Sequence, residues 1–517
     1  MTTSLRVMAA RGVVWSTLQN WGVRLMTAMA FIVISRQLQP AEFGLVALAM
    51  SILAVLTLIG DVGMANYLVR KPEIDRSDTN TAFWTSIALA STIALVLAAT
   101  APLLSHLFGE PGMTPLLWAL CGGLVIAGAA SVPTTLLKRD LAFKTLALRA
   151  TTATLIGSAV AIGLALLGAG AWALIVQSLV RGSIAAVTSF AASGWRPSFT
   201  YSRDKAGTML KFGGTLLSID LLIQARDRGE DFVLAAVNGA ATLGLWSVAS
   251  RLVRIIQETG SSVVSAVATP AFAKVQGDRK RLHRGFEVSL YTTGAVMFPP
   301  LLLLAVISPD LIPLLLGRQW TQTADVAQVI ALTTAFAVFT YFDRAIFIAV
   351  GRLRPEVLLV SGIVALHLGL VLLFADQGLL VLAFVLLARV VLFIPIRGYV
   401  LHRVTGMPFR AYFKVSRVLA AALTMGLLAQ LSILAIDSDR ALLRSLVAAG
   451  VCLLAYPPLL WLLARPVVTS IVSDLRSVRG GRRRPPPVAH EQPSADVASP
   501  HPVTKPASDV EEPIRAR

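Results

Sequence analysis

The sequence consists largely of apolar runs, separated by short polar or glycine-rich segments. A helix that crosses a lipid bilayer needs about 20 predominantly apolar residues, and each run reaches that length. The pattern therefore predicts an all-α polytopic membrane protein. We place about fourteen transmembrane helices, at residues 12–35, 43–65, 82–108, 115–137, 149–168, 171–192, 212–237, 241–266, 286–308, 325–349, 356–375, 378–400, 415–436 and 442–464.

The composition supports the membrane class. Of the 517 residues, 56% are hydrophobic and 14% are charged, whereas soluble domains have about 45–50% apolar and about 25% charged residues. Cys121 and Cys452 both lie inside apolar segments, so they indicate neither a disulfide framework nor a metal site. Arg24 lies near the centre of the first run, and no small-residue cleavage site follows, so we expect a retained helix rather than a signal peptide.

Basic residues are concentrated in alternate connections between the expected helices. Cytoplasmic loops of membrane proteins are enriched in Lys and Arg, so the basic set of loops is expected to face the cytoplasm. That set contains Arg70, Lys71 and Arg76; Lys138, Arg139, Lys144 and Arg149; Arg196, Arg203, Lys205 and Lys211; Lys274, Arg279, Lys280, Arg281 and Arg284; Arg352 and Arg354; and Arg397, Arg403, Arg410, Lys414 and Arg417. The opposite set holds little beyond Arg36, Arg318, Arg440 and Arg444. This topology puts both termini in the cytoplasm, and it explains the net charge of +18 without a nucleic-acid partner.

Residues 466–517 differ from the rest of the chain, because they are rich in Pro, Arg, Ser and Ala. They lack the apolar content that a buried core needs, so we expect a disordered cytoplasmic tail. Its basic cluster Arg482–Arg484 is interpreted as a topology anchor, with contact to anionic lipid head groups as the alternative.

A weak internal repeat relates the two halves of the chain. Residues 41–45 (Ala-Glu-Phe-Gly-Leu) and 241–245 (Ala-Thr-Leu-Gly-Leu) match at a separation of 200 residues. Many transporters consist of two such repeats with the substrate path between them. We therefore expect an N-terminal six-helix lobe at 1–200, a C-terminal lobe at 201–410 and two additional helices at 411–465.

Polar side chains form stripes on three of the expected helices. Residues three or four apart share one face of a helix, and ionisable groups in a membrane persist where they face a bundle interior or water. The stripes are Thr17, Asn20, Arg24 and Thr27; Asp220, Gln224, Asp227 and Asp231, widened by Arg226, Arg228 and Glu230; and Ser247, Arg251, Arg254 and Glu258. Other helices add Arg181, Asp343, Arg344 and Arg389. The stripes indicate a shared, water-filled cavity between the lobes.

Guanidinium groups bind phosphate and carboxylate groups and remain charged, so a cavity rich in arginine suits an anionic amphiphile. The hypothetical substrate-binding residues are Arg24, Asn20, Gln224, Arg226, Arg228, Arg251 and Arg254, and the possible ion-coupling residues are Asp61, Asp227, Asp231 and Glu258. The alternative is that these charges neutralise one another locally, for example Arg226 with Glu230 and Arg254 with Glu258. For His367, inside an apolar run, a packed structural role is favoured over a proton relay.

Motifs for catalysis and for cofactors are missing from the sequence. There is no phosphate-binding Gly-x-x-x-x-Gly-Lys-Ser/Thr loop, no cluster with metal-ligand spacing and no nucleophile elbow. The loops opposite the basic set are short, whereas a membrane glycan polymerase or ligase is expected to present a large external loop. We therefore expect a transporter with no cofactor and no metal, rather than an enzyme.

Several ordered stretches resemble the polysaccharide transporter branch of the multidrug/oligosaccharidyl-lipid/polysaccharide (MOP) superfamily, especially Wzx-type lipopolysaccharide and exopolysaccharide flippases of the colanic-acid-exporter kind. The stretches are Trp15-Ser16, residues 38–45, 63–71 and 270–278, Phe298–Leu302 and Leu314–Trp320. The resemblance implies two pseudo-symmetric six-helix lobes around a central cavity, alternating access, and a polyprenyl-diphosphate-linked oligosaccharide as cargo. The charge run 226–231 is denser than the usual polar stretch of that family.

The function expected from these observations is a flippase of the bacterial inner membrane that serves O-antigen, capsule or exopolysaccharide synthesis. Its partners would be the lipid-linked oligosaccharide, membrane lipids, and the polysaccharide polymerase and export machinery. The alternatives are a transporter of the same superfamily for another cargo, such as the peptidoglycan lipid precursor or drugs, and a membrane glycan polymerase or ligase.

Overall fold

The computed structural model describes residues 22–61, 63–273, 279–407, 409–436, 440–465 and 468–469. Asn20, Thr17 and nearly all of the expected tail at 466–517 lie outside these residues. Residues 22–37 are helical and precede α2. The other elements are α2 (Pro40–Asp61), α3 (Met64–Arg70), α4 (Arg76–Leu107), α5 (Met113–Arg139), α6 (Phe143–Leu166), α7 (Trp172–Ser193), α8 (Arg203–Ala273), α9 (Arg279–Leu316), η1 (Arg318–Trp320), α10 (Thr321–Ala337), η2 (Val338–Thr340), α11 (Asp343–Ala349), α12 (Leu353–Phe374), η3 (Ala375–Gln377), α13 (Leu379–Thr405), α14 (Arg410–Ala435) and α15 (Ala441–Leu463).

The all-α prediction is confirmed: every regular element in the described residues is a helix. Twelve helical segments within those residues are long and apolar enough to cross a membrane. The expectation of about fourteen counted a first helix that begins outside the described residues. It also counted separately two helices, at 212–237 and 241–266, that both lie within α8.

The long element α8 changes direction at Gly239. This residue has φ +79° and ψ 175°, which lies outside the helical region and is readily adopted only by glycine. The gap between the helices predicted at 212–237 and 241–266 is therefore present as a break within one helical element. The break places the charged residues 226–231 and the stripe from Ser247 to Glu258 on two separate helical segments.

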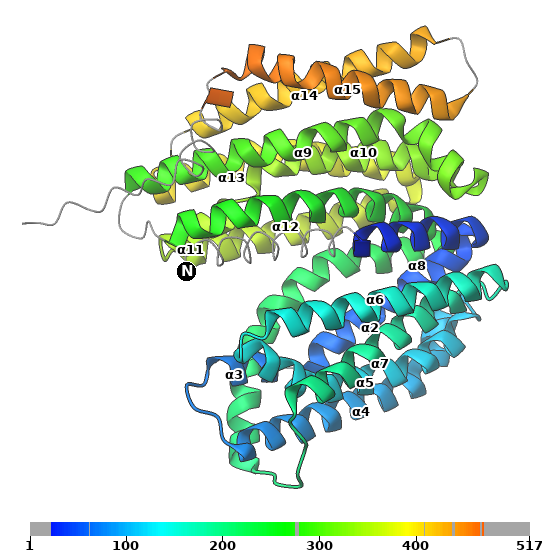
Figure 1. Ribbon diagram of the computed structural model, residues 1–517, viewed down its shortest axis with the longest axis vertical. Helices are drawn as coiled ribbons and strands as arrows, with labels where there is room; N and C mark the ends of the chain where they lie inside the picture. Colours follow the sequence, from blue (N-terminus) through cyan, green and yellow to red (C-terminus); the bar gives the residue numbers. More distant parts are fainter. Residues whose placement is uncertain are drawn as a thin grey trace, which may run out of the picture. The chain divides into compact units, whose positions relative to one another are not determined.

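The helices pack as two groups, as Figure 1 shows. In the first group α4, α5, α6 and α7 pack on one another and α2 packs on α5; in the second, α10 and α14 pack on α9, and α13 packs on α10 and α12. The element α8 contacts both groups, with α2 on one side and α9, α10 and α12 on the other. The two helices α14 and α15, expected as an addition, pack on each other and on α9.

The closest approach between helices occurs where α2 crosses α8. A Cβ atom added to Gly44 would lie 1.7 Å from the carbonyl oxygen of Ala240, and one added to Gly244 would lie 1.9 Å from that of Pro40. Gly44 and Gly244 occupy equivalent positions in the two repeated sequences, 200 residues apart. Only glycine permits such contact between helix backbones. The two matching sequences therefore contact each other, and α2 packs directly on the part of α8 that follows Gly239.

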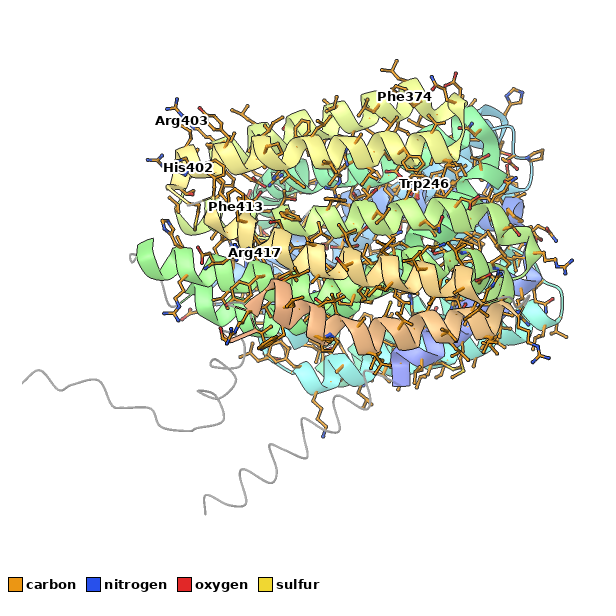
Figure 2. All side chains as sticks on the ribbon, turned by 90° about the horizontal axis from the view of Figure 1, so that it is seen from above. Trp246, Phe374, His402, Arg403, Phe413 and Arg417 are labelled. Atoms are coloured by element: carbon orange, nitrogen blue, oxygen red, sulfur yellow. The ribbon has the colours of Figure 1, made fainter. Side chains whose placement is uncertain are left out.

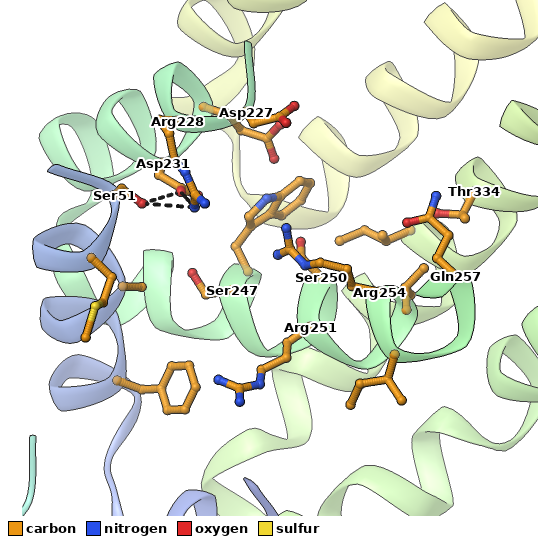
Figure 3. A pocket seen from close by; sticks show the side chains of 18 of the residues that line it. Ser51, Asp227, Arg228, Asp231, Ser247, Ser250, Arg251, Arg254, Gln257 and Thr334 are labelled. Atoms are coloured by element: carbon orange, nitrogen blue, oxygen red, sulfur yellow. Dashed lines mark hydrogen bonds and ion pairs between the residues drawn. The ribbon is translucent and has the colours of Figure 1, made fainter. Parts of the chain in front are cut away.

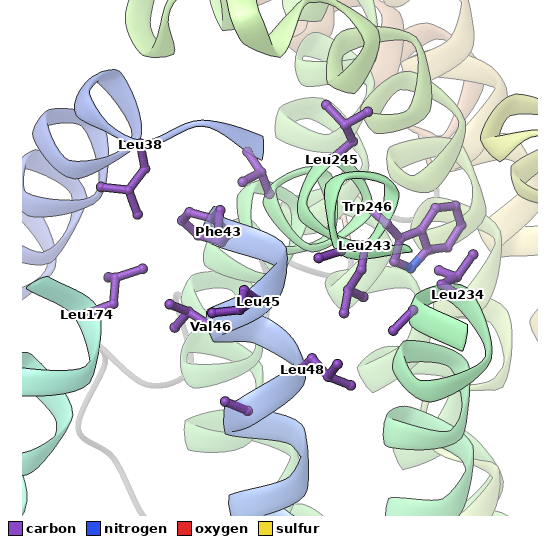
Figure 4. Close-up of a cluster of buried hydrophobic side chains, with 14 of the residues drawn as sticks. Leu38, Phe43, Leu45, Val46, Leu48, Leu174, Leu234, Leu243, Leu245 and Trp246 are labelled. Atoms are coloured by element: carbon purple, nitrogen blue, oxygen red, sulfur yellow. The ribbon is translucent and has the colours of Figure 1, made fainter. Parts of the chain in front are cut away.

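Buried apolar side chains surround this crossing. Leu45, Leu48 and Leu243 are among them, and Figure 4 shows α2 and α8 side by side with these residues between neighbouring helices. The ring of Phe43 packs edge-on against Trp320, with 5.7 Å between ring centroids. The glycine contact is therefore embedded in well-packed apolar surroundings.

Three hydrogen bonds to backbone carbonyls join the end of the helix at 22–37 to α9 and η1 near the same crossing. The indole nitrogen of Trp320 donates to the carbonyl of Ser35 at 2.8 Å. The Arg36 guanidinium donates to the carbonyls of Leu315 at 2.7 Å and Leu314 at 2.6 Å. We call these three bonds and the Gly44–Gly244 crossing the seal.

Basic side chains gather at one end of the helices. In Figure 2, Arg403, His402 and Arg417 lie at one end, whereas Phe374, at the end of α12, lies at the other. This separation matches the charge asymmetry between alternate connections in the sequence.

Charged side chains also fix the start of α4. Asp75 caps this helix by accepting a hydrogen bond from the backbone N–H of Asp78, and Lys205 at the start of α8 pairs with Asp75 at 2.6 Å. The hydrogen bond from Lys205, together with that from the Asp78 N–H, lowers the pKa of Asp75 from 3.8 to about 2. The ion pair thus joins the first group of helices to α8.

A buried charge network lies in the second group. The Arg397 guanidinium in α13 pairs with Asp343 of α11 at 2.9 Å and with Glu356 of α12 at 3.4 Å. The Asp343 carboxylate is fully buried, and the Tyr412 hydroxyl in α14 donates to it at 3.4 Å. Because buried charges need partners, this network accounts for the intramembrane Asp343 as a structural residue.

Candidate functional site

A chamber of about 860 Å³ lies between the two groups of helices. Its walls come from the helix at 22–37, α2, α7, both segments of α8, α10, α12 and α13. Figure 3 shows Arg228, Asp231, Ser247, Arg251 and Arg254 around it. The volume is near the upper end of the range of about 300–1,000 Å³ for small-molecule sites.

The first segment of α8 contributes a charged wall in which most groups are paired. Arg226 pairs with Asp227 at 2.7 Å. Arg228 lies 3.4 Å from Asp231, which also accepts a 2.6 Å hydrogen bond from Ser51 of α2. This wall is therefore nearly neutral and is tied to the first group of helices.

Glu230 of the same segment pairs across the chamber wall with His367 of α12. The distance from His367 Nε2 to the Glu230 carboxylate is 2.8 Å, and the histidine side chain is largely buried. This contact supports the packed, hydrogen-bonded role that we favoured for His367.

The second segment of α8 contributes a cationic wall. The Arg251 guanidinium lies over the Phe31 ring, 4.8 Å from its centroid, which is a cation–π arrangement. Arg254 of the same segment and Arg181 of α7 also line the chamber, as does Glu258. Among the described residues, this side of the chamber thus carries three guanidinium groups and the carboxylate of Glu258.

The described lining residues carry a net positive charge. They include six arginines (Arg181, Arg226, Arg228, Arg251, Arg254 and Arg389) and four carboxylates (Asp227, Glu230, Asp231 and Glu258). With His367 neutral, the balance is +2. Among the described residues, only Arg226 and Arg228 of these six arginines form ion pairs, and the Nε and Nη1 atoms of Arg389 are buried without a hydrogen-bond partner. An anionic ligand would compensate the four remaining guanidinium groups.

Apolar side chains complete the lining, among them Phe31, Phe43, Leu174, Trp246 and Ile330. Arginines and aromatic rings on one surface suit a ligand with both anionic groups and weakly polar faces. Within the described residues, no group of His, Cys, Asp and Glu has the geometry of a metal site.

The residues singled out from the sequence fall into three sets. Arg226, Arg228, Arg251, Arg254, Asp227, Asp231 and Glu258 line the chamber. Arg24, Gln224 and Asp61 are described but are not among its lining residues, and Asp61 at the end of α2 accepts a 2.8 Å hydrogen bond from Ser131. Asn20 lies outside the described residues. On the first helix, the lining residues are Thr27 and Phe31, one and two turns beyond Arg24.

Other lining residues were not singled out as site residues. Ser51 on α2, Gln177 with Ser178 on α7, and Thr333 with Thr334 on α10 all line the chamber. In the sequence, each of these residues is recognisable only as a polar residue inside an apolar run. This is a weak indication of a binding site, because Ser and Thr side chains also hydrogen-bond to the backbone of their own helix.

The comparison that decides the family is with the profile of the polysaccharide biosynthesis proteins, which matches residues 33–325. The chain belongs to this family. The matched range contains α2, all of α8 and the seal. The chamber residues on these two helices therefore lie within the part of the chain that the family profile matches.

Three named proteins of polysaccharide biosynthesis are similar to the chain at low identity. The succinoglycan biosynthesis transport protein ExoT of Rhizobium meliloti is 26% identical over 323 residues, which are 62% of this chain and 65% of that protein. The lipopolysaccharide biosynthesis protein WzxC of Escherichia coli is 24% identical over 331 residues, 64% of this chain and 67% of that protein. The teichuronic acid biosynthesis protein TuaB of Bacillus subtilis is 23% identical over 423 residues, 81% of this chain and 87% of that protein. The chain thus spans about two thirds of the length of the first two relatives.

Solved structures confirm the fold. The lipid II flippase MurJ in an inward closed conformation superposes with a TM-score of 0.72 at 13% identity, covering 88% of this chain and 100% of that one. An inward-facing multidrug transporter of the MATE family and MOP superfamily superposes with a TM-score of 0.60 at 14% identity, covering 74% and 96%. The chain therefore shares the fold of these two structures, which agrees with the fold that the sequence resemblance implied.

Proposed function

We propose that this protein is a flippase that moves polyprenyl-diphosphate-linked oligosaccharides across the bacterial inner membrane for the synthesis of a surface polysaccharide. The observation that carries the proposal is the chamber between the two groups of helices. It combines a net positive charge, four guanidinium groups without an ion pair in the described residues, and an aromatic surface.

The cargo proposed for this chamber is anionic at its diphosphate and polar along its glycan. Arg181, Arg251 and Arg254 would offset the desolvation of phosphate or uronate groups. Trp246 and Phe31 add aromatic atoms to the lining, which suits the weakly polar parts of sugar rings. The names of ExoT, WzxC and TuaB refer to the biosynthesis of succinoglycan, lipopolysaccharide and teichuronic acid. The family match supports the extension of this general role to the present chain.

The orientation that we propose follows the charge asymmetry. The ends rich in Lys and Arg face the cytoplasm, both termini lie there, and the seal lies toward the periplasm, since Arg36 and Pro40 belong to the connections poor in basic residues. In this orientation the structure is the state closed toward the periplasm.

Transport would proceed by rocking of two lobes, residues 1–200 and 201–410, about the chamber, with 411–465 as an attachment to the second lobe. The charged glycan enters from the cytoplasm while the lipid tail remains in the bilayer. Opening of the seal then exposes the cargo to the periplasm, where a polymerase and export machinery take it over.

Net transport needs a driving force, either an ion gradient or removal of the product. Asp227, Asp231 and Glu258 line the chamber and remain our candidates for ion coupling. Asp61 remains a candidate at the end of α2, where Ser131 donates a hydrogen bond to it.

The direct test is mass spectrometry of polyprenyl-linked glycans in cells that carry Arg251→Ala. We expect repeat units to accumulate on the cytoplasmic face and surface polysaccharide to fall, with normal protein levels in the membrane. Arg24→Ala is measured in the same assay, because Arg24 was predicted to bind the substrate but is not among the residues that line the chamber. The control is Arg403→Ala, which removes an exposed guanidinium that stacks on Tyr399 at the other end of α13. Normal surface polysaccharide in Arg251→Ala would refute the role of the cationic wall.

Deletion of the gene separates the proposed cargo from its rivals. Loss of a surface polysaccharide supports our proposal, cell lysis indicates the peptidoglycan lipid precursor, and drug sensitivity indicates a multidrug exporter. Altered polymer length with normal translocation of repeat units would instead indicate a polymerase or ligase.

A further inference from the structure

A second cavity lies within the first group of helices, beside the chamber. It has a volume of about 340 Å³ and is lined by residues of α2, α5, α6 and α7. We call it the side pocket. Ser178 and Arg181 of α7 line both the side pocket and the chamber, so the two cavities meet at these residues.

The side pocket is cationic. Its charged lining residues are Arg149 of α6 and Arg181 of α7, and none of the described residues that line it is acidic. Its other polar side chains are Thr57, Thr154 and Ser178, and the remainder of the lining is apolar or glycine. Two guanidinium groups in a small, mostly apolar cavity repel each other unless an anion lies between them.

Arg149 is held at the pocket by neutral partners. Its Nη1 donates to the hydroxyls of Thr134 at 2.7 Å and Ser189 at 2.6 Å, while its Nε is buried without a hydrogen-bond partner. The acid on the neighbouring part of α2, Asp61, accepts a hydrogen bond from Ser131 and forms no ion pair with Arg149 in the described residues. The hydroxyls orient the guanidinium but leave its charge uncompensated.

From this geometry we propose that the side pocket is a binding site for a compact oxyanion, a carboxylate or a phosphate group, held between Arg149 and Arg181. Guanidinium groups bind such oxyanions with two parallel N–H···O bonds, and the Nε of Arg149 is a donor without a hydrogen-bond partner. Because Arg181 also faces the chamber, an acidic group of a chamber ligand is one source of the oxyanion, and this part rests on the proposed function. Inorganic phosphate is the other source.

The binding test uses the full-length protein in detergent and inorganic phosphate as the probe, with chloride at the same ionic strength as reference. To remove the cationic wall of the chamber, the parent variant carries Arg251→Gln and Arg254→Gln. Phosphate is expected to raise the unfolding temperature of this parent by at least about 2 °C. Adding Arg149→Gln should abolish the shift, and adding Lys144→Gln, which removes an exposed charge from the same helix, should leave it intact.

Two further variants keep the test decisive if Arg149→Gln does not fold. Arg149→Lys retains the charge and should retain at least part of the shift, whereas Thr154→Leu fills the side pocket with both arginines in place and should abolish it. A phosphate shift that persists in Arg149→Gln or Thr154→Leu, or that is already absent from the parent, would overturn the side-pocket site. Either result leaves the flippase proposal standing, because that proposal is tested by the accumulation of lipid-linked glycans.

The source of the oxyanion is tested in cells. If an acidic sugar of the cargo occupies the pocket, Arg149→Gln should slow translocation of a repeat unit that carries a uronic acid and spare the same unit without it. If inorganic phosphate occupies the pocket, the two repeat units should be affected equally. Both results support an oxyanion site, and they assign its occupant.

Discussion

The Gly44–Gly244 crossing allows a sharp test of the seal. The perturbation is Gly44→Ala, which adds a single methyl group at the contact between α2 and α8. Its Cβ would lie 1.7 Å from the Ala240 carbonyl oxygen, whereas real Cβ atoms essentially never approach within 3.0 Å. The neighbour is backbone rather than a flexible side chain, so the two helices must separate by about 1.3 Å, the difference between these distances.

The size of the effect follows from the cost of overpacking. Extra atoms in a well-packed interface cost typically about 1–3 kcal/mol. In the two-state mechanism that we propose, the two helices separate when the seal opens, so this cost falls on the closed state alone. A difference of about 1–3 kcal/mol changes the ratio of the two states by about 5- to 150-fold, toward the state open to the periplasm.

The assay is labelling of a single cysteine in the chamber by a thiol reagent that does not cross membranes. Ser247→Cys serves as the reporter, since Ser247 lines the chamber, and Cys121 and Cys452 are replaced by serine. We expect Gly44→Ala to increase labelling from the periplasmic side. Gly122→Ala in α5 is the matched control, because a Cβ added there meets no atom within 4 Å. If Gly44→Ala is folded and labels at the control rate, the crossing does not close the chamber and our reasoning is wrong.

Two further predictions concern charged contacts. Arg397→Gln leaves the buried Asp343 carboxylate without its ion pair, which typically costs about 3–5 kcal/mol, so little folded protein should be recovered by size-exclusion chromatography, whereas Arg403→Gln should behave like the wild type. The Asp75–Lys205 pair should stabilise the protein above about pH 4, because the folded pKa of Asp75 lies below its usual value, and this contribution should be lost as the pH falls toward about 2. The difference in unfolding temperature between the wild type and Asp75→Asn should therefore shrink between these pH values, and a constant difference would argue against the pair.

Hydropathy was sufficient to predict the helices, because a membrane requires every backbone group to bond within its own segment. The predicted helix bounds left a gap at residues 238–240, where the break at Gly239 lies, and the internal repeat predicted the equivalence of Gly44 and Gly244. What the sequence did not predict was that the two helices joined at Gly239 form one interrupted element, or that the repeated glycines touch each other. The contact between the glycines depends on two segments that are 200 positions apart in the sequence.

The pairing of charges was harder to predict. Spacing within one helix suggested Arg226 with Glu230, yet Arg226 pairs with its neighbour Asp227, and Glu230 pairs with His367 from α12. The second suggested pair, Arg254 with Glu258, is not among the ion pairs of the described residues. A local pattern shows which residues share a face, but the partner on another helix decides which pair forms.

The seal also bears on how such a protein can change its cargo. Its hydrogen bonds from Arg36 and Trp320 end on main-chain oxygens of Ser35, Leu314 and Leu315, so they depend on where helices terminate and not on which side chains those acceptor positions carry. Mutations can then accumulate at lining positions such as Arg251, Arg254 and Arg389, which form none of these bonds, without removing an atom that forms the seal. A scaffold with this separation is suited to engineering for new glycans, provided that the lengths of its helices are left alone.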